Sequence, residues 1–236
     1  MRDNIKMIPT YVDGLDEALG GGIPEGNVVL LCGNPGTMKT SLAFSILYHN
    51  SHNGRKGLYV TLEEDAEDLK SAMQNMGMEN FHESELYLLD MGRLRLELAE
   101  AETDNDWLTI FEGVIREALT VASYSLIVMD SLESLYASKP PPDPRRHLFN
   151  LFGFLKDAGV TALIISEIPF GTSRLAEHGV DFLADGIILL KQFEAGDSNV
   201  QLRLRCIKMR KVKHERADFV LDIAKGRFAV TRLEKA

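Results

Sequence analysis

The sequence predicts an α/β fold with a mostly parallel, twisted sheet, helices on both faces and antiparallel strands at the C-terminal edge. Short apolar runs without polar alternation, typical of parallel strands buried on both faces, recur between segments with helical periodicity. Residues 186–236 instead hold runs separated by turn residues, and one run alternates apolar and polar positions as an antiparallel strand does. Because we find no internal repeat or linker, we expect one domain over residues 1–236.

The expected elements alternate along most of the chain. Buried parallel strands are predicted at residues 28–32, 57–62, 86–89, 126–131 and 160–165. Helical periodicity, capping residues and terminal glycines predict helices at residues 15–19, 39–52, 66–76, 106–122 and 145–158. The polar residues 92–105 are expected at the surface and partly helical. The closing strands are predicted at residues 186–190, 200–209, 218–223 and 227–230.

Residues 33–40 read GNPGTMKT and connect the first buried strand to a helix. This is close to the pattern G-x-x-x-x-G-K-[ST], in which backbone N–H groups and a helix N-terminus bind phosphate. Lys39 would reach the outer phosphates, and the Thr40 hydroxyl would help to hold a magnesium ion. Met38 stands where the pattern has its second glycine, so an ordinary turn with Lys39 in solvent is the alternative for this motif alone. The residues expected to bind nucleotide through this loop are Asn34, Pro35, Gly36, Thr37, Met38, Lys39, Thr40 and Ser41.

Carboxylates follow two of the predicted strands. Glu63 and Glu64 come directly after residues 57–62, and Asp130 ends the apolar run LIVM. Ligands of open α/β sheets bind at the C-terminal ends of the parallel strands, so these side chains are expected near the phosphate loop. Asp130 fits a carboxylate that meets a magnesium-bound water, and a helix-capping aspartate is the alternative.

Charge is distributed unevenly along the chain, whose net charge is −9. Residues 200–236 hold 11 Lys and Arg against 4 Asp and Glu, whereas residues 1–199 are strongly acidic. The basic segment could bind nucleic acid, or it could place cations against the nucleotide of a neighbouring subunit, and composition leaves both readings open.

The composition also bears on location. No apolar run reaches 18 residues, and the start of the chain lacks the apolar core of a signal peptide, so we expect a cytoplasmic protein without a membrane partner. Cys32 and Cys206 lie in apolar strand patterns and are expected to be small buried hydrophobes.

The chain resembles the KaiC-like branch of the RecA-type P-loop ATPases, close to the single-domain forms common in archaea. Six segments carry the resemblance in the family's order: GLDEALGGGIPEGNVVLLCGNPGTMKT, LYVTLEED, SLIVMDS, GVTALIISEIP, LADGIILLK and IKMRKVKH. The resemblance implies a RecA-like core that binds ATP with Mg²⁺. It also implies a homo-oligomer, usually a hexameric ring, with the nucleotide at the subunit interfaces.

The resemblance also implies roles for particular residues. The general base of this branch is the carboxylate after the second strand, which corresponds to Glu63 or Glu64, and either could orient a water in line with the γ-phosphate. Helix-start charges are the alternative for this pair. The run 208–214 matches the family's K-h-R-x-x-x-H segment, in which Lys208 and Arg210 reach the neighbour's phosphates, and His214 completes the segment. A solvated basic edge strand is the alternative there.

We therefore predict a magnesium-dependent ATPase that acts as a regulatory switch in a homo-oligomer, with a regulatory protein as a candidate partner. A RecA- or RadB-like recombinase paralogue is a second hypothesis, with single-stranded DNA held by loops near residues 138–146 and 170–178. The acidic body and the scarcity of aromatic residues in those loops disfavour it. A third hypothesis is a sensor that binds ATP and barely hydrolyses it because of Met38. The sequence leaves open the pathway, the ring size, the base preference and any autophosphorylation.

Overall fold

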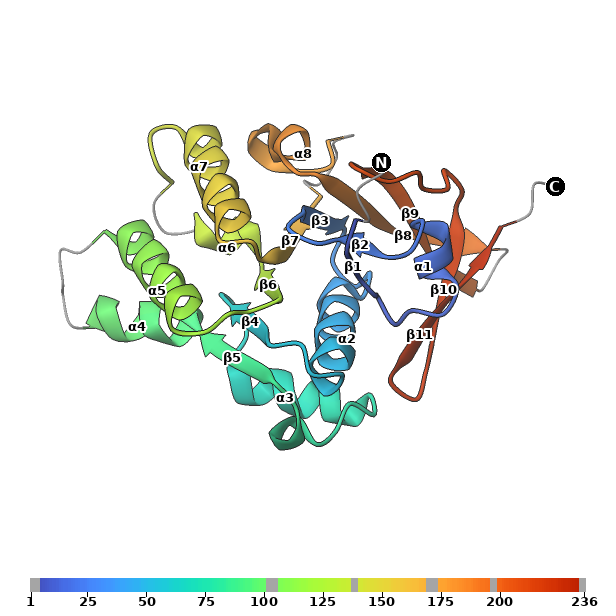
Figure 1. The fold of residues 1–236 in the computed structure, drawn as a ribbon, viewed down its shortest axis with the longest axis horizontal. Coiled ribbons are helices and arrows are strands. Elements are labelled where there is room, and N and C mark those ends of the chain that lie inside the picture. The colour runs from blue at the N-terminus through green and yellow to red at the C-terminus, as the bar shows by residue number, and fades with distance from the viewer. Residues whose placement is uncertain (1–4, 101–105, 137–139, 169–173, 196–198, 234–236) are drawn as a thin grey trace.

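A nine-stranded sheet in the order β11-β10-β9-β8-β3-β7-β6-β4-β5 runs through the molecule (Figure 1). The computed structural model describes residues 5–100, 106–136, 140–168, 174–195 and 199–233. The parallel strands are β3 (Val28–Gly33), β4 (Gly57–Thr61), β5 (Leu86–Asp90), β6 (Leu126–Asp130), β7 (Thr161–Glu167) and β8 (Gly186–Ala195). The antiparallel strands are β9 (Asn199–Met209), β10 (Phe219–Ala224) and β11 (Arg227–Arg232). A separate two-stranded sheet pairs β1 (Met7–Ile8) with β2 (Ile23–Pro24).

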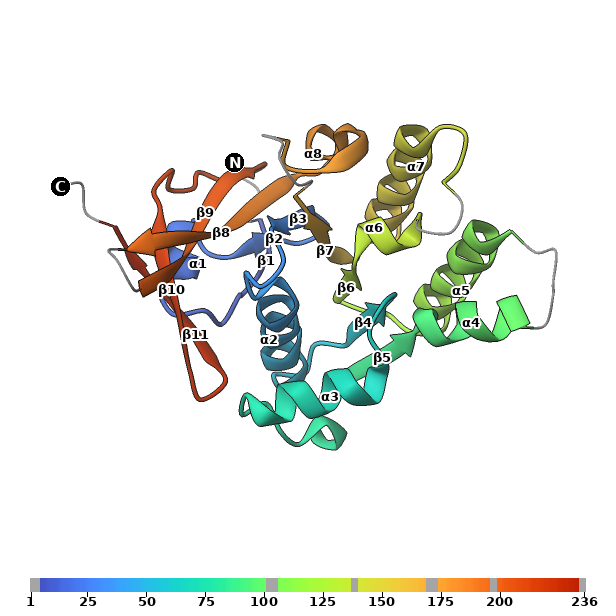
Figure 2. The same cartoon turned by 180° about the vertical axis from the view of Figure 1, so that it is seen from behind.

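Helices cover both faces of the large sheet (Figures 1 and 2). One face packs against α1 (Leu15–Ala18), α2 (Lys39–His52) and α3 (Ala66–Asn75). The other packs against α5 (Trp107–Val121), α6 (Leu132–Leu135), α7 (Pro144–Asp157) and α8 (Val180–Leu183). The remaining helical segments are α4 (Met91–Glu100) and the short 3₁₀ helices Phe81–Glu83 and Glu177–Gly179.

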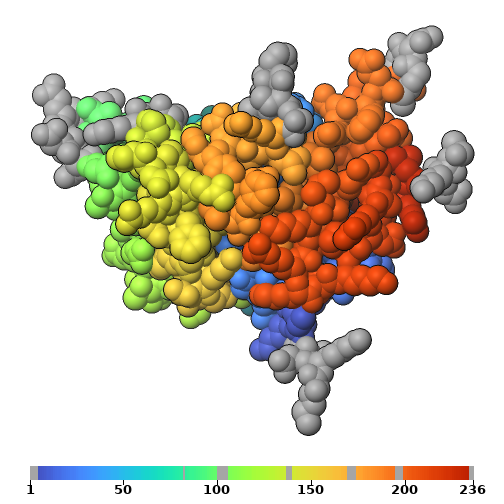
Figure 3. Space-filling view, turned by 90° about the horizontal axis from the view of Figure 1, so that it is seen from above, coloured from blue at the N-terminus to red at the C-terminus, as the bar shows by residue number. Residues whose placement is uncertain are grey.

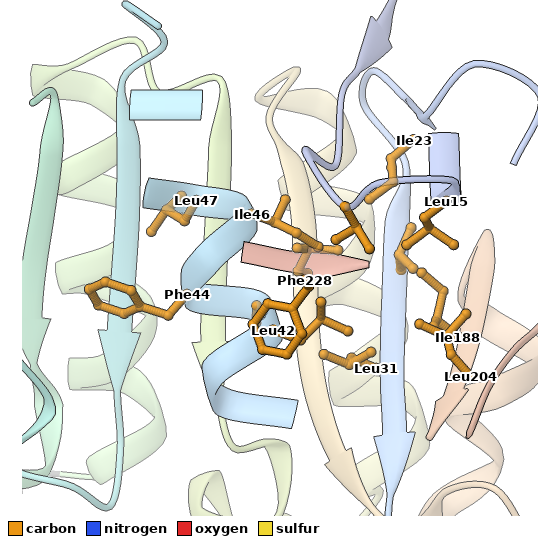
Figure 4. Close-up of a cluster of buried hydrophobic side chains, with 14 of the residues drawn as sticks. Leu15, Ile23, Leu31, Leu42, Phe44, Ile46, Leu47, Ile188, Leu204 and Phe228 are labelled. Carbon is orange, nitrogen blue, oxygen red and sulfur yellow. The ribbon is translucent and has the colours of Figure 1, made fainter. Parts of the chain in front are cut away.

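Strand β3 shows why apolar runs without alternation predict buried parallel strands. Val29 and Leu31 belong to the apolar cluster beneath α2, whereas Val28, Leu30 and Cys32 belong to the cluster on the opposite face. A strand that is buried on both faces needs apolar side chains at every position. Figure 4 shows the first of these clusters, in which α2 packs its apolar residues against the sheet.

The predicted fold class is confirmed: the sheet is mostly parallel, helices lie on both faces, and β9 to β11 form the antiparallel edge. Residues 92–100 of the expected surface excursion are helical, and residues 101–105 lie outside the described residues. Asp106 stands at the start of α5 but makes no side-chain bond to its backbone, and its carboxylate accepts a hydrogen bond from the Thr109 hydroxyl at 3.0 Å instead. Over the described ranges, none of the helices has the length and apolar character needed to cross a membrane.

Candidate nucleotide site

The loop GNPGTMKT joins β3 to α2 at the C-terminal edge of the parallel strands. The Asn34 carbonyl accepts hydrogen bonds from the Thr37 hydroxyl at 2.7 Å and from the Lys39 ammonium at 3.1 Å. Lys39 is only 7% exposed, so the alternative of a lysine that faces solvent does not hold. Gly36 has φ +77°, a conformation that glycine adopts without strain. The loop therefore curls back on itself and holds the Lys39 ammonium against the Asn34 carbonyl.

Met38 has the backbone conformation that the missing glycine would have. Its φ of 64° and ψ of 28° lie in the left-handed region, where a side chain costs about 1 kcal/mol or more. The Met38 side chain is half-buried and packs against the apolar cluster beneath α2. The methionine therefore fills space on the core side of the loop, while Asn34, Pro35 and Gly36 stay exposed.

Gln192 contacts the same loop, and no sequence pattern had singled it out. Its side-chain amide, on β8, donates to the Gly36 carbonyl at 3.1 Å. The N–H of a trans peptide points opposite to the carbonyl before it, so this bond also helps to orient the Thr37 N–H. Only the pairing of β8 with β3 reveals this contact.

Asp130 ends β6 and lies beside the first turn of α2. Its Oδ2 atom accepts hydrogen bonds from the Thr40 hydroxyl at 2.7 Å and from the Tyr59 hydroxyl at 2.6 Å. Burial raises the pKa of Asp130, and Glu63 adds to the rise, against the lowering effect of the two hydroxyls and Lys39. Carboxylate and hydroxyl oxygens suit Mg²⁺, which takes few protein ligands and completes its shell with water and phosphate. Among the described residues, no group of three or more His, Cys, Asp or Glu side chains is arranged to hold a metal ion.

Glu63 and Glu64 follow β4 on the same sheet edge. Glu63 Oε1 accepts a hydrogen bond from the Ser131 hydroxyl at 2.9 Å and another from the Ser134 hydroxyl, which fixes its carboxylate beside the end of β6. Burial, Asp130 and Asp68 raise the pKa of Glu64. Both carboxylates are exposed and therefore accessible to water.

A further carboxylate, Glu133 on α6, was not found from the sequence. Its Oε1 atom accepts a hydrogen bond from the Ser166 hydroxyl at 2.8 Å. Its Oε2 atom is buried and has no hydrogen-bond partner among the described residues. Burial raises the pKa of Glu133. With Glu133, the carboxyl groups described around Asp130 outnumber the nearby cation, Lys39. The only available signal was its position three residues after Asp130.

The structure does not bring Lys208 and Arg210 to this edge. Strand β9 is antiparallel to β8, so Lys208 pairs with Ile187 near the start of β8, whereas Leu190 of β8 pairs with Gly33 at the start of the loop. At about 3.3 Å per strand residue, Arg210 lies about 15 Å from the phosphate loop along the strand direction. The two cations therefore lie beside the start of β8, at the edge formed by the N-terminal ends of the parallel strands, opposite the edge that carries the phosphate loop.

There, Lys208 and Arg210 both contact the segment that joins α8 to β8. The Lys208 ammonium donates to the carbonyls of Asp181 at 3.2 Å, Phe182 at 3.4 Å and Ala184 at 2.6 Å. The Arg210 guanidinium donates to Asp185 Oδ1 at 3.1 Å. His214 is half-buried, and burial followed by nearby Arg216 lowers its pKa.

The loops of the DNA-binding hypothesis are only partly described. Lys139 and residues 169–173 lie outside the described residues. Arg145 and Arg146 are exposed in the first turn of α7, and Arg174 is also exposed. The exposure of these three arginines does not by itself favour nucleic-acid binding.

Comparisons with known proteins agree with the P-loop and the α/β fold described above. The family described as KaiC ATPase matches residues 8–235. A UPF0273 protein of Pyrococcus furiosus is 30% identical over 93% of this chain and 91% of its own length. One of Thermotoga maritima is 33% identical over 89% of each chain. The crystal structure of a KaiC-like protein from Pyrococcus horikoshii matches with a TM-score of 0.81 and 27% identity, covering 96% of this chain and 99% of that one.

The family match and the fold therefore agree on one class of P-loop protein, for which nucleotide binding is the shared property. The chain belongs to the KaiC ATPase family.

Proposed function

We propose that residues 1–236 form one ATPase domain that binds ATP with Mg²⁺ and hydrolyses it in a homo-oligomer, at sites shared between neighbouring copies. The observation that carries this proposal is the separation of the functional groups. Lys39, Thr40, Asp130 and the Glu63–Glu64 pair lie at one sheet edge, and Lys208 and Arg210 lie at the other. A nucleotide in the phosphate loop can meet these cations only if a second copy supplies them. A hexameric ring, as the family resemblance implies, gives every copy one such neighbour.

The residues of the loop divide the work of binding. Its N–H groups and the start of α2 bind the phosphates, and Lys39 exchanges the Asn34 carbonyl for a phosphate oxygen. Thr40 and Asp130 would hold Mg²⁺, which neutralises charge on the phosphates when bound. The raised pKa of Asp130 supports this assignment, because a carboxyl group that lacks a cation gains most from binding one.

Glu63 and Glu64 orient the attacking water and accept its proton. The water forms a bond to the γ-phosphorus, the bond from that phosphorus to the bridging oxygen breaks, and ADP leaves. One carboxylate accepts the proton of the water. The raised pKa of Glu64 suits a proton acceptor, and the hydrogen bonds of Glu63 suit an orienting role. Lys208, Arg210 and His214 of the neighbouring copy contact the phosphates, where cations stabilise developing negative charge.

A mixing experiment tests the shared site. Lys39→Ala should lose nucleotide binding, and Arg210→Ala should lose hydrolysis by about 10³-fold with nucleotide binding retained. Mixing the two inactive variants should restore activity, since one class of mixed interface holds Lys39 and Arg210 together. Arg227→Ala, which removes an exposed arginine of β11, is the matched control and should leave the rate unchanged.

Three outcomes would contradict parts of the proposal. Full activity of Arg210→Ala would contradict the role of Arg210 at a neighbouring copy's nucleotide. Full activity of a Glu63→Ala/Glu64→Ala double variant would contradict the assignment of the general base to this pair. Tight ATP binding by the wild-type protein, without any phosphate release, would instead favour a regulatory sensor that does not hydrolyse ATP.

A further inference from the structure

Asp185 is a buried carboxylate at the edge of the sheet opposite the phosphate loop. It lies between α8 and β8 and is 6% exposed. Its side chain contacts two cations: Lys156 of α7 lies 2.9 Å from Oδ2, and Arg210 lies 3.1 Å from Oδ1. Burial alone would raise the pKa of Asp185, but Lys156, the Val28 amide and Arg210 together hold it below its ordinary value. The carboxylate is therefore ionised and fully engaged.

The same residue is attached to the strand that leads to the phosphate loop. The Val28 N–H donates to Asp185 Oδ2 at 3.1 Å, and the Asp185 N–H donates to the Val28 carbonyl at 2.8 Å. Val28 is the first residue of β3. The Arg210 N–H also donates to the Asp185 carbonyl at 2.9 Å, so backbone and side chain of Arg210 are both held by this one residue.

We propose that Asp185 is a positioning residue for Lys208 and Arg210, which it holds in the place from which they reach the nucleotide of a neighbouring copy. This inference rests on the proposed function. Asp185 acts on Arg210 directly. It acts on Lys208 through the backbone just before it, because the Lys208 ammonium is bound by the carbonyls of Asp181, Phe182 and Ala184.

The contacts leave Arg210 able to bind an anion. Its side chain is 50% exposed, and its guanidinium donates one N–H to Asp185 and one to the Phe182 carbonyl. A guanidinium has five N–H groups, so others remain for phosphate oxygens. Three cations, Lys156, Lys208 and Arg210, outnumber the two carboxylates, Asp185 and Asp181, that act on them. The cluster therefore remains positive and attracts phosphate.

Anchoring matters because an arginine side chain is long and flexible. Without Asp185, the half-exposed Arg210 would sample many rotamers, and few of them would direct the guanidinium to a neighbour's phosphate. Figure 3 shows the face on which α7, α8 and the segment after β9 lie side by side, and Asp185 ties all three to β3. These contacts therefore fix the position of Arg210 relative to β3.

The test is a set of single and double variants assayed for ATP hydrolysis and ATP binding. Asp185→Asn should lower kcat by about 10- to 100-fold, with ATP affinity changed less than about threefold, because its own phosphate loop is intact. Arg210→Ala should lower kcat further. The double variant should lose less activity than the two single losses combined, because Asp185 acts in part through Arg210. Asp222→Asn, which neutralises an exposed carboxylate of β10, is the matched control and should retain at least half of the wild-type rate.

The variants separate this inference from the proposed function. Wild-type activity of Arg210→Ala would overturn both. A slow Arg210→Ala with a wild-type Asp185→Asn would overturn the inference alone, and so would additive losses in the double variant.

Two further measurements guard against a folding defect in Asp185→Asn. Mixed with the Glu63→Ala/Glu64→Ala variant, it should regain activity, because it contributes its own loop and base while the other copy contributes an intact Lys208 and Arg210. Asp185→Glu, which keeps the charge, should be faster than Asp185→Asn. No recovery on mixing, together with no rescue by Asp185→Glu, would overturn the inference.

Discussion

Two aspartates at opposite edges of the parallel sheet have opposite electrostatic surroundings. Asp130 accepts hydrogen bonds from two neutral hydroxyls, those of Thr40 and Tyr59, and burial raises its pKa. Asp185 contacts the cations Lys156 and Arg210, which hold its pKa below the ordinary value despite burial. The protein itself neutralises the charge of Asp185, whereas the charge of Asp130 lacks a full partner. The Mg²⁺ of the proposed function would bind beside Asp130, where it would supply the missing positive charge.

The largest expected effect is a difference in stability between two matched variants. Asp185→Asn should lower the free energy of unfolding by about 2 kcal/mol, because two cations lose their charged partner, a cost reduced by the partial exposure of Lys156 and Arg210. Asp130→Asn should lower it by nothing, or raise it by up to about 1 kcal/mol, because asparagine still accepts from Thr40 and Tyr59 without a buried charge. Urea denaturation of the nucleotide-free proteins measures both.

If Asp130→Asn proves as destabilising as Asp185→Asn, the contrast between the two edges is wrong. Asp68→Asn, an exposed carboxylate in the first turn of α3, provides the control for loss of a negative charge.

The pH dependence of stability should differ in sign between the same two sites. The folded pKa of Asp130 is raised, so its contribution is present below the unfolded value of about 3.9 and is lost as pH rises through the folded pKa. The folded pKa of Asp185 is lowered, so its contribution is present above about pH 3.9 and is lost as pH falls through the folded pKa. Wild type should therefore lose stability relative to Asp130→Asn above about pH 4, and lose its advantage over Asp185→Asn below about pH 4. Denaturation curves from pH 3 to pH 7 check this.

A carboxyl group shared by all three proteins, such as Glu133, cancels in these differences. Glu64 cancels only in the comparison with Asp185→Asn, because Asp130 contributes to its raised pKa. A wild-type curve parallel to both variants over the whole range would contradict the assignment of the two pKa shifts.

The smallest expected effect concerns Met38. Met38→Gly should relieve about 1 kcal/mol of backbone strain at φ 64° but lose the packing of the side chain and add freedom to the unfolded chain, so stability should change by less than about 1 kcal/mol. Hydrolysis should stay within about threefold of wild type, because the side chain packs on the core side of the loop. Rates of phosphate release, measured side by side for the wild type and Met38→Gly, test this expectation. Turnover by the glycine variant alone would favour the sensor hypothesis.

The sequence alone sufficed for the elements that depend on local pattern. A buried strand, a glycine-containing loop and a helix made GNPGTMKT recognisable, although Met38 replaces a glycine. The parallel-sheet prediction then placed Glu63 and Asp130 at the same edge, because parallel strands all end on one side. The structure agrees on both points.

The remaining parts of the candidate site depend on contacts that no local pattern encodes. Asp185 meets Val28 across 157 positions of the chain, and Gln192 meets Gly36 across 156. A shift of register between Ile187 and Ile188 near the end of β9 also sets which face Lys208 occupies. Residue types and spacing therefore determined the α/β class and the phosphate loop, since these follow from short-range periodicity and turn chemistry. Only the tertiary structure decided that Lys208 and Arg210 lie away from their own loop and that Asp185 holds them, because strand order and register bring distant residues together.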